Sequence, residues 1–335
     1  MIAVTVIGGG FMGENHARAV ADHPSLTLDS VVDIDADRAS DLAETFGADA
    51  ALTEYEDALD RSDAAIIATP ESAHADQATA ALDGGVHLLL EKPITESIKD
   101  ARTLADRSRG GDLVTGVSFI LRYDSGYARA WQTVADGDLG DLVAARVKRG
   151  ITVGESRRIG ARGHPLYYMT IHDVDALRWC TGSTVEAVRA VERRGELSDI
   201  NVPDATQALL TFADGTIATV EGYSTLPNET PGGIEASFEL VGTRGTVTVE
   251  TPGNVFSMTT QNGYDRPDIR HWPIINEEMN GAVANQVDRF AKAITDSHEM
   301  LASVHDGYRA QRVVAAIEAA IETGETVQPD EIDGS

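Results

Sequence analysis

Short apolar runs alternate with amphipathic segments along the first third of the chain. The apolar runs predict strands near residues 3–7, 28–33, 50–52, 63–69, 86–90 and 113–119. Helical patterns predict helices after the first run and at residues 36–46, 55–60, 71–82 and 95–109. Strands that alternate with helices in this way are typical of βαβ units, so the pattern predicts an α/β fold with a doubly wound parallel sheet.

After about residue 121 the pattern changes. A strand at 142–152 and one helix at 167–180 precede β-like runs at 185–191, 205–212, 216–223, 234–241, 246–250 and 255–259, and helices return at 285–295 and 307–322. Turn signals separate several of these runs, as in an antiparallel sheet. We therefore predict a Rossmann domain over residues 1–121 and an α+β domain over 122–335 with a large open, mostly antiparallel sheet. Because such a sheet commonly leaves one face for another subunit, we expect a homodimer or homotetramer through it.

Acidic residues outnumber basic ones, 54 against 27, and give a formal net charge of −27. Only four of the basic residues are lysines, namely Lys92, Lys99, Lys148 and Lys292. The acids are spread along the chain, and a surface rich in carboxylates is well hydrated and screened in concentrated salt. We interpret this charge as adaptation to a salty cytoplasm, as in a halophilic archaeon, and it disfavours a nucleic-acid partner.

The single cysteine, Cys180, leaves no internal disulfide and no cysteine zinc cluster. The first apolar run is short and leads directly into glycines, so we expect no signal peptide. No window approaches the roughly 18 apolar residues of a membrane span. These observations predict a cytoplasmic protein without a membrane partner.

The first strand leads into Gly8-x-Gly10-x-x-Gly13 and then into a helical segment. Glycines at this spacing allow a tight turn, close approach of a pyrophosphate and close helix–strand packing. The helix N-terminus adds N–H groups and a positive dipole end. Asp33 ends the second strand, at the distance expected for an acid that binds ribose hydroxyls. This context favours a dinucleotide site over a glycine turn in an α/β protein that binds no nucleotide.

Asp33 also favours NAD over NADP, because a carboxylate repels a 2′-phosphate. Arg38 follows five residues later and in principle offers a phosphate contact. In so acidic a chain, we expect it to pair instead with Asp35 or Asp41 on the helix surface.

Glu91-Lys92-Pro93 follows a buried strand, so its charges emerge at the carboxyl end of the sheet, where ligands bind in open α/β folds. Lysine releases a proton near neutral pH far more readily than arginine does. Beside a cationic nicotinamide ring, we expect the pKa of Lys92 to fall toward a value useful for general acid–base catalysis. The alternative is a lysine that caps the strand and pairs with Glu91.

Tyr168, His172 and Asp175 are spaced so that they share one face of a helix. A hydroxyl, an imidazole and a carboxylate on one face suit a polyhydroxylated substrate, and His164 lies just before this helix. The alternative for His172 is a buried histidine with a structural partner. A metal site is disfavoured because no further ligands follow at a recognisable spacing.

Together these motifs resemble the glucose–fructose oxidoreductase/inositol dehydrogenase/rhizopine-catabolism (Gfo/Idh/MocA) family. They are Gly8-Gly-Gly-Phe-Met-Gly13-Glu-Asn-His-Ala, Ala68-Thr69-Pro70 with His74, Glu91-Lys92-Pro93 and His172-Asp-Val-Asp175. The resemblance runs essentially end to end. It implies a Rossmann domain, a C-terminal domain with an open sheet used in oligomerisation, and NAD(P)-dependent oxidation or reduction of sugars and polyols.

The resemblance also implies roles for single residues. It makes Lys92 the catalytic proton-transfer residue, places His172 in the substrate and proton-relay site, and allows a cis Lys92–Pro93 bond. Cofactor contacts are expected from Gly8, Gly10, Phe11, Met12, Gly13, Asp33, Thr69, Pro70, His74 and Glu91. Substrate contacts are expected from Asp175, Arg122 and His164.

Two positions depart from the family pattern. The usual acidic residue four before the histidine is Tyr168 here, so the relay becomes Lys92–Tyr168–His172 with a neutral phenol, and Asp175 is left to hold substrate. An Asn-Arg-Arg pattern after the sixth strand reads Ile120-Leu121-Arg122, which leaves Arg122 as the charged contact.

The leading hypothesis is an NAD-dependent dehydrogenase of a sugar, polyol or nucleotide-linked sugar, with Lys92 as general acid and base. One alternative uses NAD only transiently, to oxidise a glycoside, eliminate a substituent and reduce the product again. Another is a non-catalytic NAD-binding sensor, which the phenol of Tyr168 makes conceivable.

Overall fold

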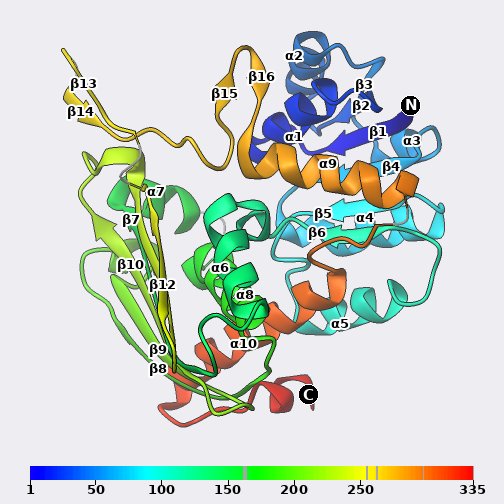
Figure 1. The fold of residues 1–335 in the computed structure, drawn as a ribbon. Coiled ribbons are helices and arrows are strands. Elements are labelled where there is room, and N and C mark those ends of the chain that lie inside the picture. The colour runs from blue at the N-terminus through cyan, green and yellow to red at the C-terminus, as the bar shows by residue number, and fades with distance from the viewer. Residues whose placement is uncertain (161–163, 254–255, 262, 297, 335) are drawn as a thin grey trace. The chain divides into compact units, whose positions relative to one another are not determined.

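The computed structural model describes residues 1–334 except 161–163, 254–255, 262 and 297. The chain forms two compact units, Met1–Asp124 with Arg270–Tyr308 and Ser125–Ile269 with Arg309–Ser335. The chain therefore returns to the first unit after most of the second has been built (Figure 1). The two units do not coincide with the contiguous ranges 1–121 and 122–335 expected from the sequence.

The first unit contains a six-stranded sheet in the order β3-β2-β1-β4-β5-β6, and its strand pairs are all parallel. The strands are β1 (Ile2–Ile7), β2 (Leu26–Val32), β3 (Ala50–Leu52), β4 (Ala64–Ile67), β5 (His87–Leu90) and β6 (Thr115–Val117). The strand order reverses between β1 and β4, so the carboxyl ends of these two strands flank the crevice in which such sheets bind ligands. The predicted doubly wound parallel sheet is confirmed.

Helices and short elements complete the first unit. They are α1 (Phe11–Ala21), α2 (Ala36–Phe46), α3 (Tyr55–Leu59), α4 (Glu71–Asp83), α5 (Ile98–Arg107), η1 (Ile120–Tyr123), α9 (Gly281–Asp296), and the hairpin β15 (Ile274–Ile275) with β16 (Glu278–Met279). Val283, Val287 and Phe290 of α9 are fully buried in one cluster with Val4 of β1 and Val20 of α1. A helix near the end of the sequence thus completes the core of the N-terminal sheet.

The second unit contains a six-stranded mixed sheet in the order β12-β11-β7-β10-β9-β8. The strands are β7 (Leu142–Thr152), β8 (Val185–Arg193), β9 (Ala205–Phe212), β10 (Ile217–Leu226), β11 (Ile234–Gly242) and β12 (Thr246–Thr251). The pair β10–β7 is parallel and the other pairs are antiparallel, as the mostly antiparallel prediction requires. Although β7 comes first in the chain, it lies inside the sheet between β11 and β10.

The remaining elements of the second unit are short except for the helices α6, α8 and α10. They are α6 (Ser125–Ala135), α7 (Val153–Gly160), η2 (Leu166–Thr170), α8 (Ile171–Thr181), η3 (Ser198–Ile200), η4 (Pro231–Gly233), β13 (Met258–Thr260), β14 (Gly263–Asp265), η5 (Pro329–Gly334) and α10 (Val304–Thr323), which begins in the first unit.

The expectation of one helix between residue 121 and the strands of this sheet was wrong, because α6 and α7 also form there. Gly126 and Gly154 stand near their starts and weaken the helical pattern in the sequence. The last predicted run, 255–259, begins at Val255, which lies outside the described residues; the strand found there is β13.

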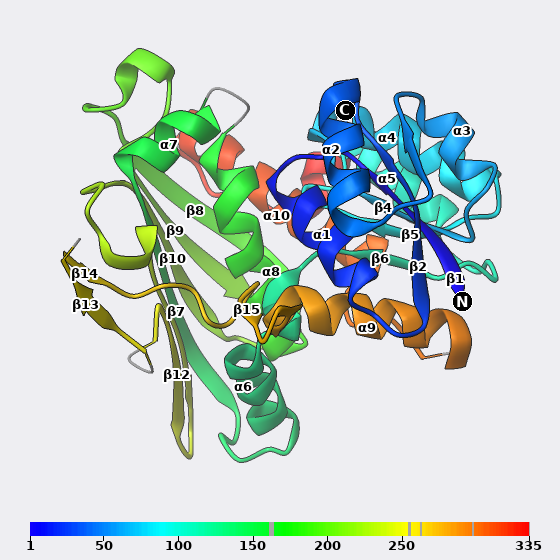
Figure 2. The same cartoon turned by 90° about the horizontal axis from the view of Figure 1, so that it is seen from above.

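One face of the second sheet is packed by α6 and α8, and Figure 2 shows these helices on that side of the strands. Side chains on the other face include Val191, Leu209 and Ile217, which are 66%, 45% and 49% exposed. Among the described residues, no helix is long and apolar enough to cross a membrane.

Candidate functional site

The loop between β1 and α1 holds its three glycines for different reasons. Gly8 has a φ of +100°, and a Cβ there would lie 2.7 Å from the backbone of Ala68 and Thr69. A Cβ on Gly13 would lie 1.7 Å from the carbonyl oxygen of Gly8. A Cβ on Gly10 would meet nothing within 4 Å, and Gly10 is the N-cap residue of α1, with no side-chain cap. The loop is therefore tightly packed at Gly8 and Gly13, whereas the space next to Gly10 is free. A pyrophosphate-binding turn requires this combination.

The carboxylate of Asp33 is held at the end of β2 by backbone groups. The N–H of Gly9 donates to its Oδ2 at 2.8 Å and the N–H of Asp35 to its Oδ1 at 2.9 Å. Arg38 lies 3.4 Å from both carboxylate oxygens of Asp33 and 3.4 Å from Asp35. The expected pairing of Arg38 with Asp35 is confirmed, and Asp33 takes the place expected for Asp41. The guanidinium thus lies between two carboxylates, next to the acid that is expected to select the cofactor.

Apolar side chains are exposed around this loop. Phe11 is 58% exposed and packs edge-on against Trp272, with 5.3 Å between the ring centroids. Ile34, directly after Asp33, is 96% exposed. Met12 instead packs against the core of the first unit. Exposed apolar groups beside this loop suit the flat faces of a dinucleotide. Neither Ile34 nor Trp272 was predicted from the sequence. For Ile34, the available signal was an apolar residue directly after the acid.

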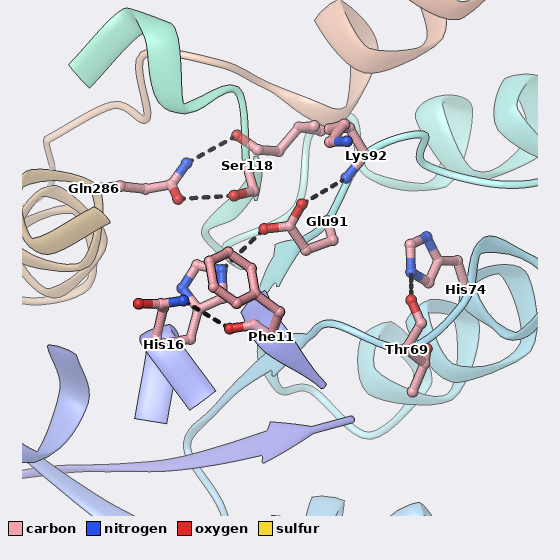
Figure 3. Close-up of polar contacts among 10 residues, drawn as sticks. Phe11, His16, Thr69, His74, Glu91, Lys92, Ser118 and Gln286 are labelled. Carbon is pink, nitrogen blue, oxygen red and sulfur yellow. Dashed lines mark hydrogen bonds and ion pairs between the residues drawn. The ribbon is translucent and has the colours of Figure 1, made fainter. Parts of the chain in front are cut away.

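Glu91-Lys92-Pro93 follows β5 directly, so the strand brings it to the carboxyl edge of the sheet. The predicted cis Lys92–Pro93 bond is present. Lys92 is half-buried, whereas Glu91 is 6% exposed. The Glu91 carboxylate lies 3.0 Å from Nε2 of the buried His16 and accepts the backbone N–H of Lys92 at 3.2 Å, as Figure 3 shows.

The charge of Glu91 is stabilised despite its burial. Desolvation by itself raises the pKa of this carboxyl, but the hydrogen bond and charge of His16, the charge of Lys92 and a hydrogen bond with Ser118 outweigh it and hold the pKa below its ordinary value. Glu91 is therefore an anion at neutral pH, close to the backbone of Lys92. Its assignment to the cofactor stays a prediction.

The turn after β4 contributes Thr69, Pro70 and His74. Pro70 is the N-cap residue of α4, and the hydroxyl of Thr69 donates to Oε1 of Gln77 at 2.7 Å. His74 is 1% exposed, with Nδ1 2.8 Å from the carbonyl oxygen of Pro93 and Nε2 2.9 Å from that of Thr69. Burial lowers the pKa of His74, against the effect of these two carbonyls. His74 thus contacts the backbone of two ligand-side loops, and its predicted cofactor contact remains a prediction.

Arg122 is 4% exposed in η1. Its guanidinium donates to the carbonyl oxygen of Leu301 and lies 3.5 Å from Asp306. These partners belong to the first unit, so the structure gives Arg122 a role in holding the returning segment; its substrate contact stays a prediction.

In the second unit, the segment before His172 is not an α-helix. Residues Leu166–Thr170 form a π-helical turn, and the α-helix begins at Ile171. We expected one α-helical face to carry Tyr168, His172 and Asp175. This was wrong, because Tyr168 lies in the π turn, and the wider π turn changes the angle between successive side chains. Sequence periodicity gave no signal for this turn.

The hydroxyl of Tyr168 accepts a hydrogen bond from Nη2 of Arg158 at 2.8 Å. The guanidinium of Arg158 lies 5.7 Å from the Tyr168 ring centroid and is also paired with Glu155. Burial of the guanidinium is outweighed, and the pKa of Arg158 is raised, chiefly by the hydrogen bond with Glu155. Arg158 lies on α7 and was missed by sequence reasoning.

Asp173 links α8 to the sheet through an ion pair. Its carboxylate makes two hydrogen bonds with Arg149 of β7, at 2.8 and 2.6 Å, and both side chains are buried. His172 is half-buried beside it, and Asp175 is fully buried. Complete burial of Asp175 does not suit the direct substrate contact expected of it, which stays a prediction.

His164 precedes the π turn and caps it. Its Nδ1 accepts the N–H of Leu166 at 3.2 Å, and its carbonyl oxygen accepts the N–H groups of Tyr167 and Tyr168 at 3.1 and 3.3 Å. Burial lowers the pKa of His164. The structure thus assigns His164 a local structural role, next to its predicted contact with substrate.

Comparison with known proteins covers both units. Residues 2–119 match a family described as an oxidoreductase family with an NAD-binding Rossmann fold, and residues 127–248 match the GFO/IDH/MocA C-terminal domain. Inositol 2-dehydrogenase from Rubrobacter xylanophilus is 34% identical over 266 residues, which span 74% of this chain and 71% of that protein.

Two solved structures are similar along nearly the whole chain. GenD2 from gentamicin A biosynthesis, in complex with NAD, is 28% identical with a TM-score of 0.84 and covers 98% of this chain and 96% of that one. A scyllo-inositol dehydrogenase from Lactobacillus casei, with bound NAD(H) and scyllo-inositol, is 21% identical with a TM-score of 0.86 and covers 98% and 99%. At that identity the second likeness concerns the fold.

Proposed function

Because the chain belongs to the oxidoreductase family with an NAD-binding Rossmann fold and a GFO/IDH/MocA C-terminal domain, we propose that it oxidises a CH–OH group of a cyclic polyol or sugar. The observation that carries the proposal is the placement of Lys92 at the carboxyl end of β5, in the same unit as the glycine loop and Asp33. The similarity to an inositol 2-dehydrogenase makes inositols the first substrates to test.

The cofactor is NAD, and the residues present fit it. The space above Gly10 suits the pyrophosphate, and the anchored carboxylate of Asp33 suits the ribose hydroxyls. Ile34 offers an apolar face for the adenine ring. When bound, NAD supplies the hydride acceptor, and its positive nicotinamide ring disfavours the ammonium form of a nearby lysine.

We assign the proton transfer to Nζ of Lys92, which takes the proton of the substrate hydroxyl during oxidation and returns it during reduction. His172 and Tyr168 are assigned to the substrate hydroxyls. The hydroxyl oxygen of Tyr168 already accepts a hydrogen bond from Arg158. Arg158 of α7 therefore helps to fix the position of the phenol.

The test is NADH production, followed by absorbance, over a panel of inositols, aldoses and UDP-sugars. We expect turnover with one or more cyclic polyols or sugars and a preference for NAD over NADP. Binding of NAD without turnover across the whole panel would contradict the proposal and favour a sensor.

The charge supports a further part of the proposal, adaptation of the protein to molar salt such as that of a halophilic archaeal cytoplasm. With a net charge of −27, self-repulsion is strongest in dilute buffer. The melting temperature is expected to rise between dilute buffer and molar KCl. A melting temperature that is independent of KCl would contradict this part, and the panel above is best run at both salt concentrations.

The open face of the second sheet supports a homodimer or homotetramer. Two cations of this face are already paired with acids of the sheet, Lys148 3.4 Å from Glu235 and Arg146 3.8 Å from Glu239, so a second copy can cover Leu209 and Ile217 without leaving these two cations unpaired. Sedimentation of the wild type and of a Leu209→Glu variant tests this. Identical monomeric behaviour of both would contradict it.

A further inference from the structure

Two buried histidines contact the segment that contains Lys92, one on each side of it. His16 of α1 contacts the side chain of Glu91, and His74 of α4 contacts the backbone carbonyl of Pro93. Their side chains are 0% and 1% exposed. Figure 3 shows Glu91 between His16 and Lys92, with His74 beside Thr69 on the other side of Lys92. The half-buried Lys92 therefore lies between two fixed neighbours.

The contact of His16 runs through one ring atom. Nε2 lies 3.0 Å from Oε1 of Glu91, whereas Nδ1 is buried without a hydrogen-bond partner among the described residues. An N–H on Nε2 therefore serves the carboxylate, and that carboxylate in turn accepts the backbone N–H of Lys92 at its other oxygen. His16 fixes the direction of the Glu91 side chain and, through it, the peptide group that precedes the Lys92 side chain.

The contact of His74 differs because both ring nitrogens face carbonyl oxygens. A neutral imidazole carries one N–H, so only one of the two carbonyls receives a full hydrogen bond from it at a time. Either contact joins α4 to a loop on the ligand side of the sheet, one at Pro93 and one at Thr69. The Pro93 contact is the one that bears directly on Lys92.

Packing behind the segment leaves it little room to move. Ile94 and Thr95 are fully buried, and a Cβ on Gly307 would lie 2.5 Å from the Ile94 side chain. Ser118 lies close to Glu91, and its hydroxyl donates to Oε1 of Gln286 on the returning helix α9 at 2.9 Å. The segment is thus held by side-chain and backbone contacts from both faces of the sheet.

We propose that His16 and His74 are positioning residues that hold Glu91, Lys92 and Pro93 so that the Lys92 amino group is placed for proton transfer. Neither histidine needs to touch substrate for this role, and neither takes a proton from it. The inference rests on the proposed role of Lys92. It adds that the helices following the two cofactor-side loops, α1 and α4, set the position of that lysine.

Asparagine and glutamine substitutions separate the two contacts of each ring. The amide of asparagine reaches about as far as Nδ1 of histidine, and that of glutamine about as far as Nε2. His16→Gln therefore keeps a donor toward Glu91, and His16→Asn withdraws it. At the other histidine the order is reversed, because His74→Asn keeps the contact with Pro93 and His74→Gln keeps only the contact with Thr69.

We expect a crossed pattern in kcat. His16→Asn and His74→Gln should each lower kcat by about tenfold, since a small displacement of a catalytic group costs that much or more. His16→Gln and His74→Asn should stay within about threefold of the wild type, as for loss of part of one hydrogen bond. The KM for NAD should change little in the two His16 variants, and the acid limb of the pH profile of kcat/KM should shift in His16→Asn, because Glu91 loses its partner.

His87 provides the matched control. It lies at the opposite end of β5, where its Nδ1 accepts the backbone N–H of Val114 at 2.9 Å. His87→Asn and His87→Gln should leave kcat and the pH profile unchanged. Melting temperatures of all six variants show how much of each effect follows from stability alone.

The outcomes separate this inference from the function on which it rests. If Lys92→Met abolishes turnover but kcat is the same in the two variants of each histidine, the positioning role is overturned and the role of Lys92 stands. The positioning role is also overturned if the losses of kcat among the histidine variants merely parallel their losses of melting temperature. If Lys92→Met keeps most of the turnover, the proposed function itself fails, whatever the histidine variants show.

Discussion

The end of β5 and the start of α8 carry comparable candidate chemistry, but the sequence predicts the first far better than the second. Lys92 follows a buried apolar strand, and a strand that ends in a parallel sheet delivers the next residues to a known edge whatever their periodicity. Tyr168 and His172 were placed by assuming an α-helical repeat, and the π turn at Leu166–Thr170 breaks that repeat. The position of a motif at the end of a strand is therefore easier to predict from sequence than the set of residues that share one face of a helix.

The largest effect is expected at the strand end. Lys92→Met should lower kcat by about 10²- to 10⁴-fold, because it removes the group assigned to proton transfer while keeping the volume of the side chain. Lys92→Arg keeps the charge but not a proton that is readily released, so it should be almost as slow. Steady-state assays with the best substrate of the panel measure kcat for both variants. A near-native kcat in Lys92→Arg would show that Lys92 contributes only a positive charge to binding.

The two regions also differ in how far their partners could be predicted. The doubly wound sheet, the glycine loop and Asp33 follow from short-range patterns, since each needs only a strand, a turn and the next few residues. The Arg158–Tyr168 bond, the Arg149–Asp173 pair and the return of residues 270–308 to the first unit depend on contacts between segments far apart in sequence. One sequence carries no pairing information for such contacts, because any arginine can meet any carboxylate in an acidic chain.

The second prediction concerns the attachment of α8 to its sheet. Asp173→Asn should lower the free energy of unfolding by about 3–5 kcal/mol, because it leaves the guanidinium of Arg149 buried without its counter-charge. Asp199→Asn is the matched control, since Asp199 pairs with Arg157 at an exposed site. Chemical denaturation in molar KCl measures both, and equal midpoints for the two variants would contradict the structural role of the Arg149–Asp173 pair.

The third prediction returns to the first unit. Asp33→Ser removes the acid proposed to bind the ribose hydroxyls and frees Arg38 from one of its two carboxylates. We expect kcat/KM for NAD to fall by about 10- to 100-fold, as for loss of hydrogen bonds to a charged group, and kcat/KM for NADP to rise. The double variant with Arg38→Leu should lose the gain with NADP; if it keeps that gain, the guanidinium is not the phosphate contact.

The smallest effect is expected at Tyr168. Arg158→Leu removes the donor to its hydroxyl and should raise the KM for substrate by about 3- to 10-fold, the value of one ordinary hydrogen bond, with the KM for NAD unchanged. Arg157→Leu is the control on the same helix, because Arg157 pairs with Asp199 instead. Equal KM values in the two variants would show that the Arg158–Tyr168 bond does not contribute to substrate binding.

Net hydride transfer from a substrate carbon to NAD can be followed with a deuterium label. The substrate found in the panel is prepared with deuterium on the carbon that bears the reacting hydroxyl. We expect deuterated NADH to accumulate in stoichiometry with the ketone or lactone product, and Lys92→Met to slow this accumulation. Product formed without NADH, or deuterium returned to the product carbon, would rule out net hydride transfer to NAD and favour transient oxidation without net redox change.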